Sequence, residues 1–273
     1  ANNCGFFSKE NNYTHVIMNP PYKKIASSSD HRKALRNAGV ETVNLYTGFV
    51  ATAIQKLSSG GELVAIIPRS FCNGPYYLPF RRYILNQTAI QHIHLFESRS
   101  KAFAEDKVLQ ENIIIHLIKG VDQGPITITS SPKADFHFDY ETESFTATDK
   151  TTRIVPVESV VAPYDKQKFF HIAANDRDQQ IIDRLSCFRT SLSDLEIEVS
   201  TGAVVDFRLK EDLRKNIEDN AVPLLYPIHI KDGLTWPKES KKPNAIAISD
   251  QSRKWLWQNS WSYVLVRRFI IKE

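Results

Sequence analysis

Hydrophobic and polar positions follow two different periods along the first 120 residues. An apolar strand is predicted at residues 13–18, and it must end at Asn19-Pro20-Pro21-Tyr22, because two consecutive prolines cannot continue a β-ladder. From Glu41 onward, apolar residues recur at helical spacing up to residue 57. Gly60-Gly61 is expected to end that helix.

The pattern then returns to strands. Residues 63–68 form a continuous apolar run, typical of a strand that is covered on both faces. A helix carrying Phe80 and Ile84 follows, and residues 90–96 and 112–118 predict two further strands. About fifteen residues without a helical pattern join the last two strands, which favours an antiparallel pair. This order predicts an α/β fold with a helix-covered sheet.

The alternation of strand and helix patterns ends near residue 120. We expect a first domain over 1–120, a linker or edge hairpin over 121–152 that is rich in Gly, Pro, Ser and Thr, and a second, mixed α+β domain over 153–273. The second domain contains all four tryptophans, which we expect to build its core. The chain begins in the middle of a domain pattern without Met and ends after an apolar run, so we interpret it as part of a longer protein.

Composition excludes several classes. The 42% hydrophobic and 24% charged residues are ordinary for a globular protein and exclude disorder, collagen and coiled coil. The longest apolar run, residues 63–67, is far shorter than the roughly 20 residues of a membrane span. Three scattered cysteines and no leader predict a reduced, cytoplasmic protein without structural zinc. The net charge of +4 is divided equally between residues 1–150 and 151–273, which allows nucleic-acid binding without indicating it.

The tetrapeptide at the predicted strand end carries the candidate chemistry. Ligands bind at this edge of open α/β sheets. Asn19 offers a side-chain carbonyl, Pro20 a backbone carbonyl held by the rigid ring pair with Pro21, and Tyr22 an aromatic face. Two acceptors and a stacking surface suit a planar ring with an exocyclic amine. Accepting both N–H groups frees the nitrogen lone pair and stabilises the positive charge that develops as the amine attacks a methyl group.

The chain resembles the adenine-N6 DNA methyltransferases of restriction–modification systems. The similarity extends far beyond the tetrapeptide and covers nearly the whole chain. It runs through residues 16–25, 44–46, 60–61, 67–74, 94–99, 108–112, 201–202, 204–208, 242–246 and 263–269.

This resemblance implies a partial Rossmann-like methyltransferase sheet followed by a target-recognition domain. It also implies that Asn19 and Pro20 accept the amino group of an adenine flipped out of duplex DNA, while Tyr22, Pro21 and Phe103 contact the base. Asp206 and Arg208 lie where the family begins its DNA-reading part, and an ion pair between surface groups is an equally open interpretation. The basic candidates for phosphate contact are Lys238, Lys241, Lys242, Arg267 and Arg268.

The resemblance also implies S-adenosylmethionine as the methyl donor and a cognate restriction endonuclease as a possible partner. In the family, a strand with a Gly-containing turn and an acidic residue precede the Asn-Pro-Pro-Tyr strand. Only eighteen residues precede Asn19 here, so we expect the cofactor-binding half to lie outside this chain. Two alternatives stay open: methylation of a protein glutamine amide, whose nitrogen is delocalised in the same way, and a DNA-binding fragment that is inactive alone.

Two other groups of residues resemble sites. His92 and His94 are two apart on a strand and share one face, but the sequence offers no third ligand at a suitable spacing, so we interpret them as structural. Cys72 has no paired histidine motif, and the proposed reaction needs neither a metal nor a covalent nucleophile.

Overall fold

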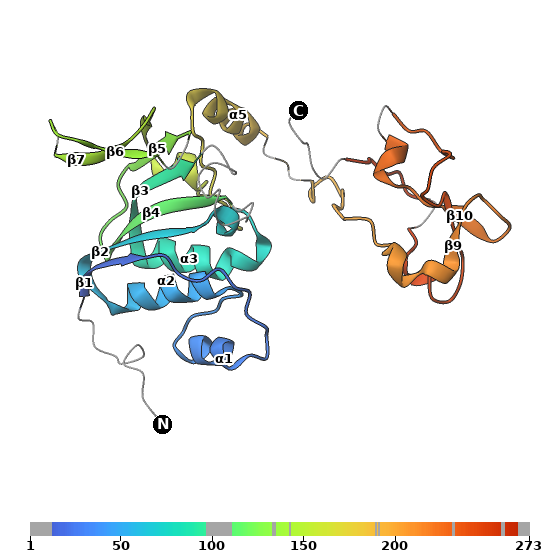
Figure 1. Cartoon of the computed structure of the whole chain (residues 1–273), viewed down its shortest axis with the longest axis horizontal. Helices are drawn as coiled ribbons and strands as arrows, with labels where there is room; N and C mark the ends of the chain where they lie inside the picture. The colour runs from blue at the N-terminus through green and yellow to red at the C-terminus, as the bar shows by residue number, and fades with distance from the viewer. Residues whose placement is uncertain are drawn as a thin grey trace. The chain divides into compact units, whose positions relative to one another are not determined.

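The structure is a computed structural model of the whole chain, and it describes residues 13–96, 111–132, 135–141, 143–188, 190, 192–230, 233–257 and 260–266. The chain forms two compact units, residues 1–189 and 190–273, which are described separately (Figure 1). Phe103, Arg267 and Arg268, three of the candidate site residues, lie outside the described residues.

A six-stranded mixed sheet is the centre of the first unit. Its strand order is β1-β2-β4-β3-β5-β8, with β1 parallel to β2, β3 parallel to β5, and the other neighbouring strands antiparallel. The strands are β1 (Tyr13–Met18), β2 (Leu57–Pro68), β3 (Thr88–Phe96), β4 (Asn112–Lys119), β5 (Ile126–Ser131) and β8 (Thr151–Val155). The predicted α/β class and the antiparallel β3–β4 pair are confirmed.

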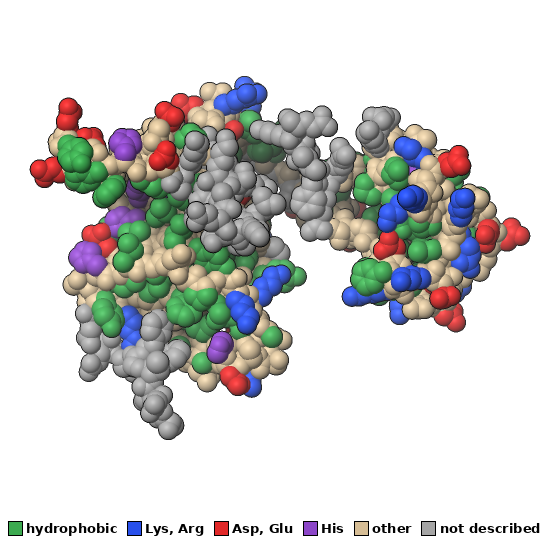
Figure 2. All heavy atoms as spheres, in the orientation of Figure 1, with side chains coloured by type: hydrophobic (Ala, Val, Ile, Leu, Met, Phe, Trp, Pro, Cys, Tyr) green, Lys and Arg blue, Asp and Glu red, His purple; other side chains and the backbone are tan. Residues whose placement is uncertain are grey.

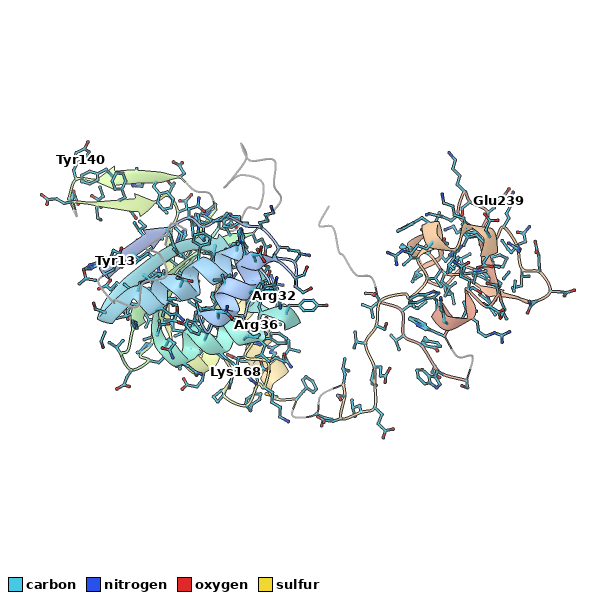
Figure 3. The ribbon with its side chains drawn as sticks, turned by 90° about the horizontal axis from the view of Figure 1, so that it is seen from below. Tyr13, Arg32, Arg36, Tyr140, Lys168 and Glu239 are labelled. Atoms are coloured by element: carbon cyan, nitrogen blue, oxygen red, sulfur yellow. The ribbon has the colours of Figure 1, made fainter. Side chains whose placement is uncertain are left out.

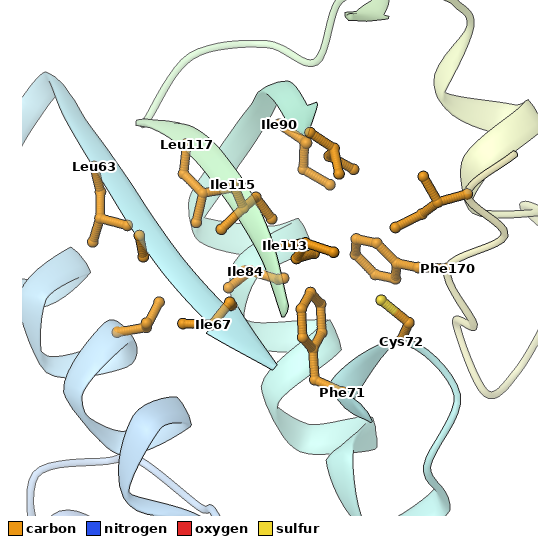
Figure 4. Packing of buried hydrophobic residues seen from close by; sticks show 14 of the residues in the cluster. Leu63, Ile67, Phe71, Cys72, Ile84, Ile90, Ile113, Ile115, Leu117 and Phe170 are labelled. Atoms are coloured by element: carbon orange, nitrogen blue, oxygen red, sulfur yellow. The ribbon is translucent and has the colours of Figure 1, made fainter. Parts of the chain in front are cut away.

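Helices cover one face of this sheet (Figure 1). From Gly61 onward, every second residue of β2 is buried. Leu63 and Ile67 pack against the helices, and β4 contributes Ile113 and Ile115 in the same way (Figure 4). Each such leucine or isoleucine side chain contributes about 1.5–3 kcal/mol by leaving water. The helices of this unit are α1 (Asp30–Asn37), α2 (Leu45–Lys56), α3 (Leu78–Gln87), α4 (Val157–Val160) and α5 (Asp176–Ser186), with short 3₁₀ turns η2 (Arg69–Cys72) and η3 (Pro75–Tyr77).

Ion pairs attach the short helix α1 to the segment that precedes α2. The helix begins at an N-cap, Ser29, whose hydroxyl accepts the Arg32 N–H. Arg32 and Arg36, neighbours one turn apart (Figure 3), both bind Glu41 just before α2, at 2.7 and 2.8 Å. Hydrogen bonds from Arg36 and then Arg32 lower the pKa of Glu41 to about 2, so this carboxylate stays ionised over the ordinary pH range.

The opposite face of the sheet is only partly covered. The β2 residues that point to this second face are half-buried: Glu62, Val64 and Ile66. The prediction that this strand is covered on both faces is therefore correct for one face only. A hairpin formed by β6 (Phe136–Asp139) and β7 (Ser144–Ala147) lies over part of this second face. The predicted strand 13–18 is an edge strand: Ile17 is 86% exposed.

The boundaries expected at residues 120 and 152 differ from the structure. Residues 126–131 and 151–155 are strands of the main sheet, and the hairpin alternative applies to 136–147. The first unit extends to residue 189, because Phe170 packs on Phe71 and its N–H donates to the Cys72 carbonyl (Figure 4). The Gly- and Pro-rich composition around β5 is typical of a linker. The strand joins the sheet only by pairing with β3, a long-range contact that local composition does not reveal.

The second unit has little regular structure. Its three-stranded antiparallel sheet has the order β10-β11-β9, and its small core contains Leu209, Leu224 and Ile246. Trp255, Trp257 and Trp261 are exposed, so the expectation that the tryptophans build this core is wrong for these three. The elements are η5 (Asp206–Arg208), η6 (Lys210–Asp212), β9 (Leu213–Arg214), β10 (Ala221–Pro223), η7 (Pro227–Ile230), β11 (Ala245–Ala247) and η8 (Arg253–Trp255).

Buried polar groups hold the second unit together. The Asn244 side chain accepts from the Lys238 N–H at 3.0 Å and donates to the Lys215 carbonyl at 3.0 Å, and its Oδ1 lies 3.0 Å from a ring nitrogen of buried His229. One amide thus connects three segments of the chain. In the described part of the whole chain, no helix is long and apolar enough to cross a membrane.

Candidate active site at the end of the first strand

The Asn-Pro-Pro-Tyr turn lies where β1 and β2 end together. Met18 pairs with Ala65, which places the turn beside the last residues of β2. Pro20 is buried, whereas Asn19 and Pro21 are exposed and Tyr22 is half-buried. The turn therefore presents the Asn19 side chain to solvent while its proline ring anchors the backbone.

The Tyr22 hydroxyl connects the two strand ends. Its oxygen lies 2.8 Å from Asn19 Oδ1 and 3.1 Å from the Ile66 carbonyl, and it can donate to either acceptor. The Tyr22 ring meets the ring of buried Tyr46 edge to face, with 6.2 Å between centroids. These contacts orient the ring and the amide together. A carbonyl oxygen has two lone pairs, so Asn19 Oδ1 can accept a second N–H.

A network of amide and hydroxyl groups continues from Tyr46. Its hydroxyl lies 3.1 Å from Ser70 Oγ, which donates to the Tyr77 hydroxyl at 3.4 Å, and the Asn44 amide donates to the same hydroxyl at 3.1 Å. Burial raises the pKa of Tyr46 well above its ordinary value, so this hydroxyl stays protonated. Sequence reasoning assigned no role to these four residues, although residues 44–46 and 67–74 carry part of the family resemblance.

A buried arginine holds the turn that carries Ser70. Arg81 is 0% exposed and donates to the carbonyls of Phe71, Gly74 and Gln167 at 2.7–2.9 Å. Sequence reasoning missed it, although Arg81 lies on the same face of α3 as Ile84, three residues later. An arginine within an apolar stripe was the signal that could have found it.

Two expectations about other groups can be compared with the structure. Burial raises the pKa of Cys72 to about 12, so its sulfur is a thiol rather than a nucleophilic thiolate. His92 and His94 share the partly covered face of the sheet, with His116 beside them, around a cavity of about 280 Å³. Both His92 and His94 bind the Thr129 hydroxyl, at 2.7 and 2.8 Å.

The burial of His94 should make the stability of the first unit depend on pH. His94 is 7% exposed, and burial, followed by the nearby His92, lowers its pKa to about 4. The unfolded chain binds this proton near pH 6.5, so the stabilisation is complete above pH 6.5 and is lost as the pH falls toward 4. We expect the free energy of unfolding of the first unit to fall by up to about 3 kcal/mol over this range because of His94.

The measurement is urea unfolding followed by circular dichroism at several pH values, since all four tryptophans lie in the second unit and their fluorescence does not report on the first. His94→Gln should flatten the pH dependence, whereas His15→Gln, on the exposed face of β1, should leave it unchanged. An equal pH dependence in wild type and His94→Gln would contradict the prediction.

The candidate DNA-binding residues of the second unit contact other residues of the same unit. Lys242 binds Asp206 at 3.3 Å and lies over the Tyr226 ring, Lys238 donates to the Ile228 carbonyl, and Arg208 lies over its neighbour Phe207. Asp206 and Arg208 lie in the short 3₁₀ turn η5. Figure 2 shows basic side chains interspersed with acidic ones on the visible face of this unit.

Comparison with known proteins shows what the chain is similar to. Residues 2–103, which include the Asn-Pro-Pro-Tyr turn, match the Eco57I restriction-modification methylase family. Residues 2–103 therefore correspond to an Eco57I-type restriction-modification methylase domain. It is 49% identical over 262 residues to Type II methyltransferase M.BsuBI of Bacillus subtilis and 42% identical over 264 residues to Type II methyltransferase M.PstI of Providencia stuartii.

The chain matches only part of each relative. Each alignment covers 96% of this chain and 50% of the relative, so the chain spans half the length of both proteins. This agrees with the interpretation of the chain as part of a longer protein. Among solved structures, a type I restriction–modification system aligns at 13% identity over 67% of this chain and 45% of that chain, with a TM-score of 0.43. The type IIG restriction endonuclease BpuSI aligns at 15% identity over 53% and 19%, with a TM-score of 0.40.

Proposed function

We propose that this methylase is the target-base and recognition part of an enzyme that methylates the N6 amino group of a flipped-out adenine in duplex DNA. The observation that carries the proposal is the paired placement of Asn19 and Tyr22, an exposed amide acceptor held beside an aromatic ring by one hydroxyl. The similarity to Type II methyltransferases of restriction–modification systems favours DNA over a protein amide as the acceptor. A cognate endonuclease acting on the same site is the corresponding partner.

The residues of this chain would act on the amine directly. Asn19 Oδ1 and the Pro20 carbonyl would accept its two N–H groups, and Tyr22 would stack on the base with Pro21 at its border. These two hydrogen bonds become stronger as positive charge develops on the nitrogen. They therefore stabilise the transition state more than the bound adenine. Phe103 would cover the second face of the base, and Asp206, Arg208, Lys238, Lys241, Lys242, Arg267 and Arg268 would contact DNA.

S-adenosylmethionine is the methyl donor that we propose, and it would supply the electrophilic methyl group. Its ribose hydroxyls and ammonium group require acceptors, usually carboxylates. The described residues that we assign to the site are asparagine, proline, tyrosine and serine, and none carries a carboxylate. This set does not fit the cofactor. We propose, as the family resemblance implies, that residues outside this chain bind it.

The test is methyl transfer by the full-length protein. We would incubate it with labelled S-adenosylmethionine and mixed-sequence duplex DNA, digest the DNA and identify the labelled nucleoside. Label in N6-methyladenine supports the proposal. Label in another nucleoside, or in protein alone, overturns it.

Tyr22 separates stacking from hydrogen bonding. Tyr22→Phe keeps the ring and removes the hydroxyl that orients Asn19. We expect kcat/KM to fall about 2- to 10-fold, which corresponds to the usual net free-energy contribution of one hydrogen bond. Tyr22→Ala also removes stacking, worth about 1–3 kcal/mol, and should cost a further 5- to 150-fold. Steady-state kinetics on the mapped site measure both values. Equal losses in the two variants would contradict a stacking role.

A further inference from the structure

The turn η5 of the second unit is fixed at both of its ends. At its start, the Asp206 carboxylate accepts hydrogen bonds from the Phe207 N–H at 2.8 Å, from Lys242 Nζ at 3.3 Å and from the Tyr226 hydroxyl at 3.4 Å. Directly after its end, Leu209 is 3% exposed and belongs to the small core of the unit. The backbone between these two anchors is therefore held in place.

The two residues between the anchors expose their side chains. Phe207 is 66% exposed, and the guanidinium carbon of exposed Arg208 lies 5.6 Å from the centroid of the Phe207 ring. The guanidinium makes no hydrogen bond or ion pair with the residues that the structure describes. Arg214 differs, because it binds Glu218 at 3.2 Å and two backbone carbonyls. Arg208 thus has a ring beside its planar fork while all five N–H donors stay available to a ligand.

The charges around Arg208 balance, which favours a neutral ligand over a phosphate. Residues 206–212 and the ion-paired Lys242 carry three positive and three negative side chains: Arg208, Lys210 and Lys242 against Asp206, Glu211 and Asp212. Phosphate binding gains most from an excess of lysine and arginine. The exposed Phe207 ring favours the same conclusion, because apolar side chains contact the bases themselves, for example the methyl group of thymine.

We infer that Arg208 recognises a guanine of the target sequence in the major groove, with the Phe207 ring beside its guanidinium. This inference rests on the proposed function and deepens it, because it names the base that one DNA-contacting residue would read. Two N–H groups of a guanidinium match O6 and N7 of guanine, and none of the other three bases presents two acceptors in that groove. Asp206 would be a positioning residue, since its contacts with Lys242 and Tyr226 fix the turn.

The experiment uses the full-length protein and the DNA site mapped by methyl transfer. Each guanine of the site is replaced in turn by 7-deazaguanine, which lacks the N7 acceptor and still pairs with cytosine, and the Kd of each duplex is measured. For wild type we expect a loss of about 10-fold at one guanine, the size of one charge-assisted hydrogen bond. Arg208→Gln should bind unmodified DNA about 5- to 150-fold more weakly, the range of one bidentate base contact, and should lose nothing further at that guanine.

Three further variants accompany this comparison. Arg253→Gln is the matched control, because Arg253 is also an exposed arginine of the second unit but has no aromatic ring beside its guanidinium among the described residues. It should stay as sensitive as wild type at that guanine. Phe207→Leu should weaken binding to unmodified DNA about 2- to 5-fold, the size of an exposed cation–π contact. If circular dichroism shows that Arg208→Gln does not fold, Arg208→Met, which keeps an unbranched stem without donors, carries the same comparison.

Several outcomes overturn the inference while the proposed function stands. They are a mapped site without guanine, wild-type binding that is insensitive at every guanine, and a folded Arg208 variant that stays as sensitive as wild type. Neutral methylphosphonate linkages test the phosphate alternative: a wild-type loss at one linkage that disappears in Arg208→Gln would assign this side chain to the DNA backbone and also overturn the inference. If wild type methylates no DNA, both the inference and the proposed function fall.

Discussion

Asn19→Ala is expected to lower methyl transfer by about 100- to 1,000-fold, the range measured when one preorganised polar contact to a developing charge is removed. The loss should appear in kcat rather than KM, because Asn19 Oδ1 accepts most strongly once the amine becomes positive. DNA affinity should change little, since the amide is a single contact in a large interface. Single-turnover transfer of labelled methyl groups to the mapped site is the measurement.

Two further variants sharpen this result. Asn19→Asp retains an acceptor at the same position and should retain more activity than Asn19→Ala. Asn86→Ala replaces an exposed asparagine on α3 and should match wild type. Full activity in Asn19→Ala would disprove the role of this amide, while a loss that comes with unfolding would be recognised from the circular dichroism of the variant.

Arg81→Ala is expected to destabilise the first unit by about 3–5 kcal/mol. The substitution leaves the carbonyls of Phe71, Gly74 and Gln167 without their donor and opens a cavity in a closed core. Burial lowers the pKa of Arg81, and no carboxylate forms an ion pair with it among the described residues, so its three carbonyl contacts and the Phe169 ring at 4.9 Å hold the charge. Urea unfolding followed by circular dichroism measures the change.

The neighbouring residue provides the control. Arg82 is exposed and donates to one carbonyl, that of Lys166, at 3.3 Å, so Arg82→Ala should cost less than about 1 kcal/mol. Arg81→Lys should lie between the two, because an ammonium group cannot reach three carbonyls with the geometry of a guanidinium. A cost for Arg81→Ala as small as that for Arg82→Ala would show that the turn at residues 69–74 does not depend on this side chain.

Local pattern was sufficient for the elements that are defined by their own residues. The period of the apolar positions predicted the helix ahead of β2, the helix around Phe80 and Ile84, and the β3–β4 pair. The boundary near Gly60-Gly61 was wrong: α2 ends at Lys56, and β2 already begins at buried Leu57 and runs through both glycines. Strand pairing extends β2 beyond its apolar run, and a local pattern does not contain that pairing.

Long-range pairing decided the domain boundary. Strand β5 joins the sheet by pairing in parallel with β3, and β8 then pairs with β5, so residues that resemble a linker belong to the first unit. The exposed tryptophans and the edge position of β1 have the same origin, because which surfaces a unit covers depends on elements that are distant in sequence.

The sequence by itself determined the candidate chemistry, because Asn19, Pro20 and Tyr22 are adjacent and the prolines force the turn that presents them. The tertiary structure alone decided what surrounds that turn. Asn44 meets Tyr77 across 33 positions, and Tyr22 reaches Ile66 across 44. Arg81 holds a segment 86 positions away. Such contacts arise when the chain folds back on itself and buries polar groups that must be paired, and only the packed sheet and helices specify which groups those are.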